Sequence, residues 1–135
     1  MFFPKNRKYN KSFMLMKKGI EYRTNKVVFG TFGIKAIGEG FIKASHIETV
    51  RRLISKRVKR IGSFWIRIFP NVSITKKPLE VRMGKGKGAH SFWAFYVRKG
   101  RILFEIEGLN RKEVLDIVYF CNQKLPFKVK ILDKN

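Results

Sequence analysis

The chain has 135 residues, with 31 lysines and arginines against nine aspartates and glutamates, and its formal net charge is +22. This length suits one domain with a real core and excludes two independent lobes. Because 44% of the residues are hydrophobic and 14% are aromatic, the chain is not a disordered basic tail, and its charge argues against an ordinary metabolic enzyme.

The charge itself indicates the kind of partner. A small folded body with a charge of +22 repels itself, so we expect its working state to include a dense polyanion, with nucleic acid as the first candidate. A membrane surface comes second, because the basic residues are spread along the chain rather than along one amphipathic helix. No apolar run approaches the roughly 18 residues of a transmembrane helix, so no membrane insertion is expected.

The first 25 residues are predicted to form an extended basic arm. They carry seven cations against a single acid, Glu21, and show the period of neither a strand nor a helix. We expect this arm to become ordered on its partner and residues 26–135 to form a single α+β domain. Within that domain, Val27 to Ile37 has the composition of a strand, and its glycines predict a bulge or a bent hairpin.

A first helix is predicted from about residue 46 to residue 61. Ser45 followed by Glu48 has the spacing of a capping box, which satisfies backbone donors at a helix start. Apolar side chains then recur every three or four residues along one stripe: Ile47, Val50, Leu53, Ile54, Val58 and Ile61. The opposite face has no acid between residues 51 and 60, whereas a merely solvated helix usually mixes charges. We therefore predict a nucleic-acid-binding face made of Arg51, Arg52, Lys56, Arg57, Lys59 and Arg60.

The middle of the chain is predicted to be mostly β-structure. Phe64 to Pro70 alternates like a strand that proline closes, and residues 71–91 follow as a long polar loop. Two strands are then expected at about 92–97 and 102–106, joined by a short basic hairpin, Arg98-Lys99-Gly100-Arg101.

A second helix and a last strand complete the pattern. Asn110 with Glu113 predicts a capping box, and the inner stripe of the helix is Val114, Ile117, Val118, Cys121 and Leu125. The last strand places Phe127, Val129 and Ile131 inward. This order favours an α+β fold, a mainly antiparallel sheet with two helices packed on one face, plus the basic arm and a glycine-lysine loop. Most acids crowd into residues 105–116, so we expect that region to face away from the polyanion.

The glycine-lysine loop is the sharpest local feature. In Arg82-Met83-Gly84-Lys85-Gly86-Lys87-Gly88, the alternate glycines remove side chains that would hold the backbone away from a ligand, and in an extended chain the two lysines between them point the same way. We interpret it as a loop for an RNA backbone, with a flexible surface loop and a nucleotide cradle as alternatives. The cradle lacks the glycine-lysine-serine ending of a P-loop. A nucleotide cradle would make the protein an RNA-modifying or nucleotide-using enzyme.

No catalytic residue, metal site or cofactor is expected. His46 and His90 lie far apart in the sequence without an obvious acid or nucleophile beside them. A single cysteine, Cys121, excludes a disulfide within the chain and a cysteine-based zinc cluster. Trp65 fits two interpretations equally, stacking on a base or filling the core.

Two segments closely resemble the signatures of a known family. They are KRIGSFWIRIFP over residues 59–70 and PLEVRMGKGKG over residues 78–88, with Trp93 five residues further on. Pro4-Lys5 and Lys124-Leu125-Pro126 also fit. Over essentially its whole length, the chain is similar to the bacterial-type large-subunit ribosomal protein L16 family.

The resemblance implies a structural protein that binds large-subunit ribosomal RNA near the aminoacyl-tRNA site and the peptidyl transferase centre, and that joins late in assembly. The implied partners are this RNA, aminoacyl-site tRNA and neighbouring large-subunit ribosomal proteins, and no homo-oligomer is expected. By the same resemblance, the loop from Arg82 to Gly88 (Arg82, Met83, Gly84, Lys85, Gly86, Lys87, Gly88) reaches the tRNA site. The expected RNA-binding residues are Lys5, Arg7, Lys8, Lys11, Lys17, Lys18, Arg51, Arg52, Lys56, Arg57, Lys59, Arg60, Trp65 and Arg67.

The composition also indicates the kind of genome. Lysine, isoleucine, phenylalanine and asparagine, which have A/T-rich codons, are abundant. We therefore expect an A/T-rich genome and a mitochondrial ribosome, with the gene in the organelle. A plastid ribosome and the cytoplasm of an A/T-rich bacterium are the alternatives.

Overall fold

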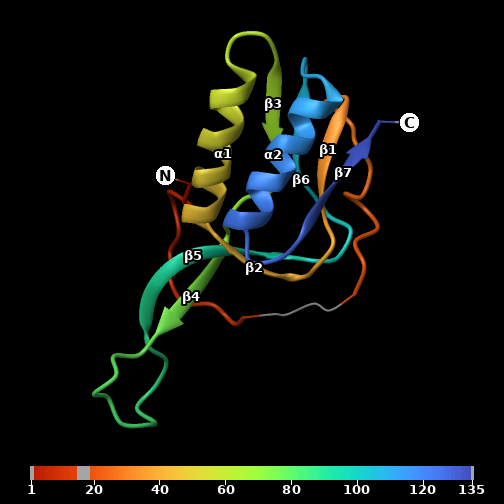
Figure 1. Ribbon diagram of the computed structural model, residues 1–135. Coiled ribbons are helices and arrows are strands. Elements are labelled where there is room, and N and C mark those ends of the chain that lie inside the picture. Colours follow the sequence, from red (N-terminus) through yellow and green to blue (C-terminus); the bar gives the residue numbers. More distant parts are fainter. Residues whose placement is uncertain (1, 15–18, 135) are drawn as a thin grey trace.

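The computed structural model describes residues 2–14 and 19–134, which contain seven strands and two helices (Figure 1). In chain order these are β1 (Phe32–Ala36), β2 (Gly40–Lys43), α1 (Ala44–Val58), β3 (Ser63–Ile66), β4 (Val72–Lys76), β5 (Ala89–Val97), β6 (Ile102–Glu107), α2 (Arg111–Lys124) and β7 (Val129–Asp133). The expected α+β class is confirmed.

The strands form two antiparallel sheets, where we expected one. The larger sheet has the order β3-β6-β1-β7, and the smaller has the order β2-β5-β4. Gly33 in β1 lies opposite Glu105 in β6 and opposite Leu132 in β7, so β1 is paired on both sides. In the smaller sheet β5 is the central strand, because it pairs with β2 and with β4.

The predicted basic hairpin at residues 98–101 is wrong. The strand before it, β5, lies in the smaller sheet and the strand after it, β6, lies in the larger one, so this segment crosses between sheets. Gly100 makes the crossing with a φ of 87° and donates its N–H to the Ala36 carbonyl at 2.8 Å. The expected long loop at 71–91 is also shorter than predicted, because Val72–Lys76 forms β4 and leaves residues 77–88 as the connection to β5.

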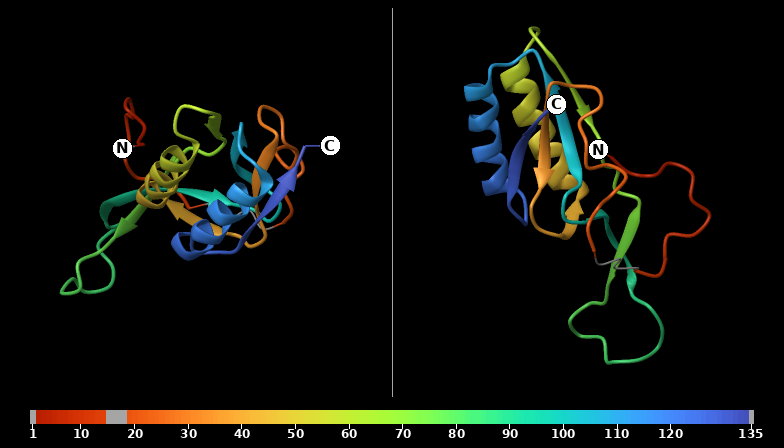
Figure 2. Two further views of the ribbon diagram at one scale, coloured as in Figure 1. Left: turned by 45° about the horizontal axis from the view of Figure 1, so that its top comes forward. Right: turned by 90° about the vertical axis from the view of Figure 1, so that its right-hand side faces the viewer.

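Both helices cover one face of the larger sheet, side by side (Figure 2). Their buried side chains pack with those of β1 and β6, such as Ile34 and Phe104, into one core. Burial of each large apolar side chain contributes about 1.5–3 kcal/mol. The inner stripe predicted for α2 is confirmed in full, and its members are buried: Val114, Ile117, Val118, Cys121 and Leu125. In α1 the stripe stops at Val58, because the helix ends there and Ile61 is 78% exposed.

The start of α2 is also as predicted. Asn110 precedes the helix in an extended conformation, and its N–H donates to the Glu113 carboxylate at 2.9 Å. The two residues form the expected capping box. At the other end, the N–H of Leu125 donates to the Cys121 carbonyl at 2.9 Å, and Pro126 then prevents further helical turns.

The chain is attached to the body well before β1. Glu21 is buried, its N–H donates to the Lys99 carbonyl at 2.9 Å, and its carboxylate accepts from Arg101 at 3.0 Å. Three residues later, the Thr24 carbonyl accepts the N–H of Ile102 at 2.9 Å. Residues 21–31 therefore follow the larger sheet before the chain enters it.

Candidate nucleic-acid interface

The C-terminal half of α1 presents a cluster of cations to solvent. The buried stripe of this helix includes Val50, Ile54 and Val58, which fixes the direction of the opposite face. The residues on that face and in the turn after it are exposed: Arg52, Lys56, Arg57, Lys59 and Arg60. In the described part of the chain no acidic side chain forms an ion pair with the last four. Their charge is therefore available to an external anion.

The N-terminal half of α1 differs from the prediction. The helix begins at Ala44, with Lys43 rather than Ser45 in the capping position and no side chain capping it. Glu48 instead accepts hydrogen bonds from Arg51 at 2.8 Å and from Arg52 at 2.9 Å, and these bonds lower the pKa of its carboxyl to about 2. The predicted capping box is thus wrong, and two of the six cations have a partner within the helix.

The loop of residues 77–88 projects from the end of the smaller sheet, away from the helices (Figures 1 and 2). Residues 82–87 are all exposed. We expected an extended backbone here, but Gly84, Lys85 and Gly86 have φ angles of 92°, 54° and 84°. Three successive left-handed residues bend the loop sharply, which explains the glycines on either side of Lys85.

Hydrogen bonds give this loop internal and external support. Lys77 donates its ammonium to the Gly84 carbonyl within the loop. Lys87 donates to the Ser12 carbonyl, and Lys11 donates to the Lys87 carbonyl at 3.1 Å. Arg82 and Lys85, in contrast, have no hydrogen-bond or ion-pair partner among residues 2–14 and 19–134.

Among residues 2–14 of the basic arm, Lys11 and Ser12 contact the loop and Arg7 contacts β5. Lys5, Arg7, Lys8 and Lys11 are all exposed. The guanidinium of Arg7 lies 5.0 Å from the centre of the Trp93 ring, within cation–π range. Lys17 and Lys18, which we also expected to bind RNA, lie outside the described residues.

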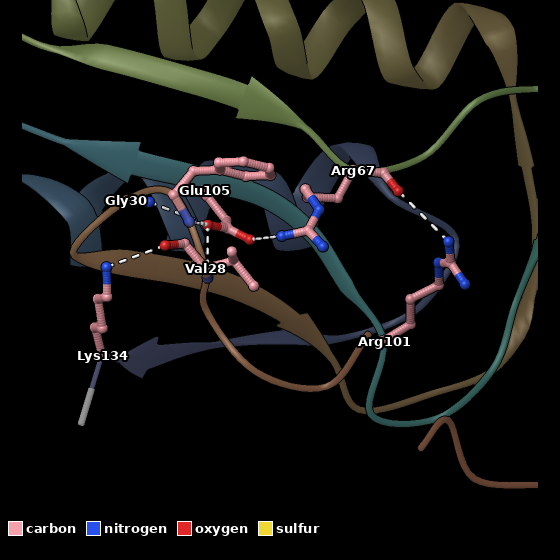
Figure 3. A network of polar contacts seen from close by, with 7 residues as sticks. Val28, Gly30, Arg67, Arg101, Glu105 and Lys134 are labelled. Carbon is pink, nitrogen blue, oxygen red and sulfur yellow. Dashed lines mark hydrogen bonds and ion pairs between the residues drawn. The ribbon is translucent and has the colours of Figure 1, made fainter. Parts of the chain in front are cut away.

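Arg67 has a partner inside the protein (Figure 3). Its guanidinium is ion-paired with Glu105, whose side chain is completely buried in β6. The other oxygen of that carboxylate accepts the backbone N–H groups of Val28, Phe29 and Gly30 at 3.0, 2.6 and 3.0 Å. Arg67 thus differs from the free cations of α1 and of the loop.

Burial works to raise the pKa of the Glu105 carboxyl, but the hydrogen bonds from Gly30, Phe29 and Val28 and the charge of Arg67 outweigh it. The resulting pKa lies below its usual value. We expected the acids of residues 105–116 to lie in a region that faces away from the polyanion, but the side chain of Glu105 is completely buried. Its position in the middle of an apolar strand, Ile102 to Ile106, was the signal for a buried structural role.

Trp65 is half-buried in β3, and its ring stacks on Phe29 with 6.0 Å between ring centres. Of its two predicted roles, this contact supports the packing role on one face of the ring. Phe29, whose side chain is 54% exposed, was not among the predicted site residues.

The histidines and the cysteine that were weighed for catalysis lie in the following surroundings. His90 lies in β5 rather than in a loop, and its Nδ1 is 2.7 Å from the Ser73 hydroxyl. Burial, and then the charge of Lys43, lowers the pKa of His46. Cys121 is buried, which raises the pKa of its thiol to about 12. Within the described ranges, no three potential ligands gather for a metal ion, and neither helix could cross a membrane.

A family model described as "Ribosomal protein L16p/L10e" matches residues 4–132. The chain belongs to this family. A protein of Francisella tularensis subsp. holarctica named "Large ribosomal subunit protein uL16" is 44% identical over 134 residues, which are 99% of this chain and 98% of that protein. The protein of the same name from Coprothermobacter proteolyticus is 42% identical over 134 residues, 99% of each chain.

Membership of the L16p/L10e family confirms the resemblance seen in the two sequence signatures. The chain is a structural constituent of the large ribosomal subunit and not an enzyme, so the nucleotide-using alternative is dropped. Both relatives are bacterial proteins, and they give no support to the expected mitochondrial origin.

Proposed function

We propose that this ribosomal protein binds large-subunit ribosomal RNA through three cationic segments, namely the basic arm, the end of α1 and the loop of residues 77–88. The observation that carries the proposal is the cluster Lys56, Arg57, Lys59 and Arg60, which is exposed and has no acidic partner in the described residues. Phosphate groups would neutralise it, and the net charge of +22 provides the long-range attraction.

The basic arm and the folded domain both take part in RNA binding. We propose that the basic arm of residues 1–25 contacts RNA through its exposed cations, while Glu21 and Thr24 attach its end to the folded RNA-binding domain of residues 26–135. The exposure of Lys5, Arg7, Lys8 and Lys11 supports this role of the arm. The charge also opposes self-association, so we expect no homo-oligomer and infer that neighbouring large-subunit proteins are the protein partners.

Salt dependence tests the proposal. Each phosphate contact releases counterions, so the logarithm of the association constant should fall against the logarithm of the salt concentration by about 0.7–0.9 per contact. We expect a slope of several such contacts when the full chain binds large-subunit ribosomal RNA. A slope near zero would contradict the proposal.

We further propose that the loop of residues 77–88 lies beside tRNA in the aminoacyl site, close to the peptidyl transferase centre. The family resemblance suggests this place, and the projection of the loop and the unpartnered Arg82 support it.

Replacing Arg82 tests the position of the loop. In assembled large subunits, Arg82→Ala should lower the affinity for aminoacyl-site tRNA at least several-fold, because it removes a free cation while leaving the core intact. Leu79→Ala is the matched control, since this side chain is 97% exposed in the same loop and carries no charge. Unfolding of the Arg82 variant, or unchanged tRNA binding, would refute the assignment.

Late joining to the subunit is proposed on the family resemblance alone. Pulse-labelled chain should appear in nearly complete large-subunit particles and not in early precursors.

The origin of the ribosome needs a separate test. The amino-acid composition supports an A/T-rich genome, and the bacterial relatives favour a bacterial ribosome over a mitochondrial one. Sedimentation of the native chain with large subunits from purified mitochondria would instead establish the organelle.

A further inference from the structure

A groove of about 510 Å³ lies beside the end of β3. One of its lining residues, Phe2, belongs to the basic arm, and the others lie outside the three cationic segments. Its walls come from the start of the basic arm, from the segment before β1, from the end of β3 and the chain after it, from β5 and from the crossing that follows β5. The lining residues that matter here are Phe29, Phe69, Phe95, Arg67, Arg101 and Asn71.

Flat groups form the walls of this groove. The guanidinium of Arg67 lies 4.9 Å from the centre of the Phe29 ring, and that of Arg101 lies 4.7 Å from the centre of the Phe95 ring. Between β3 and β4, Phe69 is 46% exposed although it is aromatic. The groove therefore presents rings and guanidinium groups together with two aliphatic side chains, Ile66 and Ile68.

The charges of the two guanidiniums are already balanced. Arg67 is ion-paired with Glu105, and Arg101 is ion-paired with Glu21 at 3.0 Å (Figure 3 shows the first pair). A phosphate site needs uncompensated positive charge, as at the end of α1. These paired guanidiniums are instead held in position against the rings of Phe29 and Phe95, so a ligand would meet a preformed wall at little further cost in side-chain entropy.

An unpaired nucleobase fits this chemistry. Bases that are splayed out of an RNA strand stack on aromatic side chains and on guanidinium planes. At the rim, Asn71 is exposed and offers both a donor and an acceptor to the edge of a base. The sugar and phosphate of such a nucleotide would stay on the solvent side, where the overall charge of +22 favours an RNA strand.

We infer that this groove holds one unpaired base of large-subunit ribosomal RNA, stacked against Phe69 between the Phe29–Arg67 and Phe95–Arg101 pairs. The inference rests on the proposed function, because it assumes that the chain binds this RNA. It adds a site that recognises a base to segments that recognise phosphates.

The first test locates the base. The full chain is bound to large-subunit ribosomal RNA and irradiated with ultraviolet light, and the cross-linked peptides are sequenced. We expect a cross-link between the peptide that contains Phe69 and one unpaired nucleotide. A cross-link to a different protein in assembled subunits, with none to RNA, would overturn the inference.

The second test measures the stacking. Phe69→Ala should weaken RNA binding about tenfold, and Phe69→Trp should restore it, because stacking on an aromatic ring is worth about that much per base. Tyr119→Ala on α2 is the control, since this aromatic side chain is also exposed, at 63%, and should change the affinity less than twofold.

An abasic nucleotide at the cross-linked position allows a double-mutant cycle between the base and Phe69. It should weaken wild-type binding as much as Phe69→Ala does, and it should weaken binding of the Phe69→Ala variant no further. Additive losses would overturn the inference.

The salt slope separates this inference from the proposed function. Phe69 carries no charge, so Phe69→Ala should lower the affinity at every salt concentration and leave the slope unchanged. An unchanged affinity with a steep slope would overturn the base site alone. A flat slope for the wild-type chain would contradict the proposed function itself.

Discussion

Glu105 shows how one buried acid can organise its surroundings in a chain with only nine acids. Its carboxylate receives three backbone N–H groups from residues 28–30 and the guanidinium of Arg67. It thereby joins the segment before β1 to β6 and to the end of β3. Because all of these donors are directed at one ionised group, its removal leaves several of them unsatisfied in the interior.

Replacing this carboxylate should therefore destabilise the fold. We expect Glu105→Gln to lower the free energy of unfolding by about 3 kcal/mol, because it leaves Arg67 without its counter-charge. Urea denaturation of the full chain measures the loss. Glu107→Gln is the matched control, an exposed acid on the same strand, and it should change stability by less than about 0.5 kcal/mol. Equal losses in the two variants would refute the role of Glu105.

The same residue predicts a dependence on pH. The pKa of Glu105 is lower in the folded state than its ordinary value of 4.5, so ionisation favours folding. Its contribution is complete above about pH 4.5 and disappears as the pH falls through the lowered pKa. The stability difference between the wild type and Glu105→Gln should therefore be constant at neutral pH and shrink below pH 4.5. A difference that grows in acid would contradict this sign.

The two helices show what local sequence can and cannot predict. Both have the spacing of a capping box, yet only Asn110 and Glu113 form one. At α1 the carboxylate of Glu48 has two arginines within four residues. It accepts hydrogen bonds from these charged donors instead of from a backbone N–H at the start of the helix. The apolar stripes were predictable because helical periodicity fixes a face, whereas the competition for Glu48 depends on side-chain geometry.

Single substitutions at the end of α1 test whether its cationic cluster contacts RNA phosphates. Each of Lys56→Gln, Arg57→Gln, Lys59→Gln and Arg60→Gln that removes a phosphate contact should reduce the salt slope of RNA binding by about 0.7–0.9. Lys112→Gln on α2, an exposed cation near the acids of residues 105–116, should leave the slope unchanged. If Lys112→Gln had the same effect as the α1 variants, the binding surface would not be localised on α1.

At the scale of the whole molecule, the pairing of the strands could not be predicted from local sequence patterns. The positions of β5 and β6 were close to the prediction, but the two strands do not pair with each other and lie in different sheets. For the same reason the length of the arm could not be judged, because the contacts of Glu21 and Thr24 are with residues 99–102. The cationic segments were visible in the sequence, whereas the groove beside Phe69 depends on five separate segments.

Two truncations test where the arm ends. Removal of residues 2–14 takes one partly buried side chain, Phe2, from the edge of the core and should cost little stability. Removal of residues 2–25 also takes Glu21 and Thr24, and we expect a further loss of about 1–3 kcal/mol, because Arg101 loses its charged partner. Urea denaturation distinguishes the two steps. If the first truncation cost more than the second step, the attachment would begin earlier than Glu21.

The pairing of β1 with β7 has a consequence for biosynthesis. Phe32 lies opposite Asp133, so the central strand of the larger sheet finds one of its two neighbours only after about a hundred further residues have been translated. In a nascent chain, one edge of β1 therefore stays unpaired until β7 has been made. The hairpin of β4 and β5 is local in sequence and can form earlier. Because the chain is highly positively charged, incomplete copies repel one another, and this repulsion opposes pairing between their exposed strand edges.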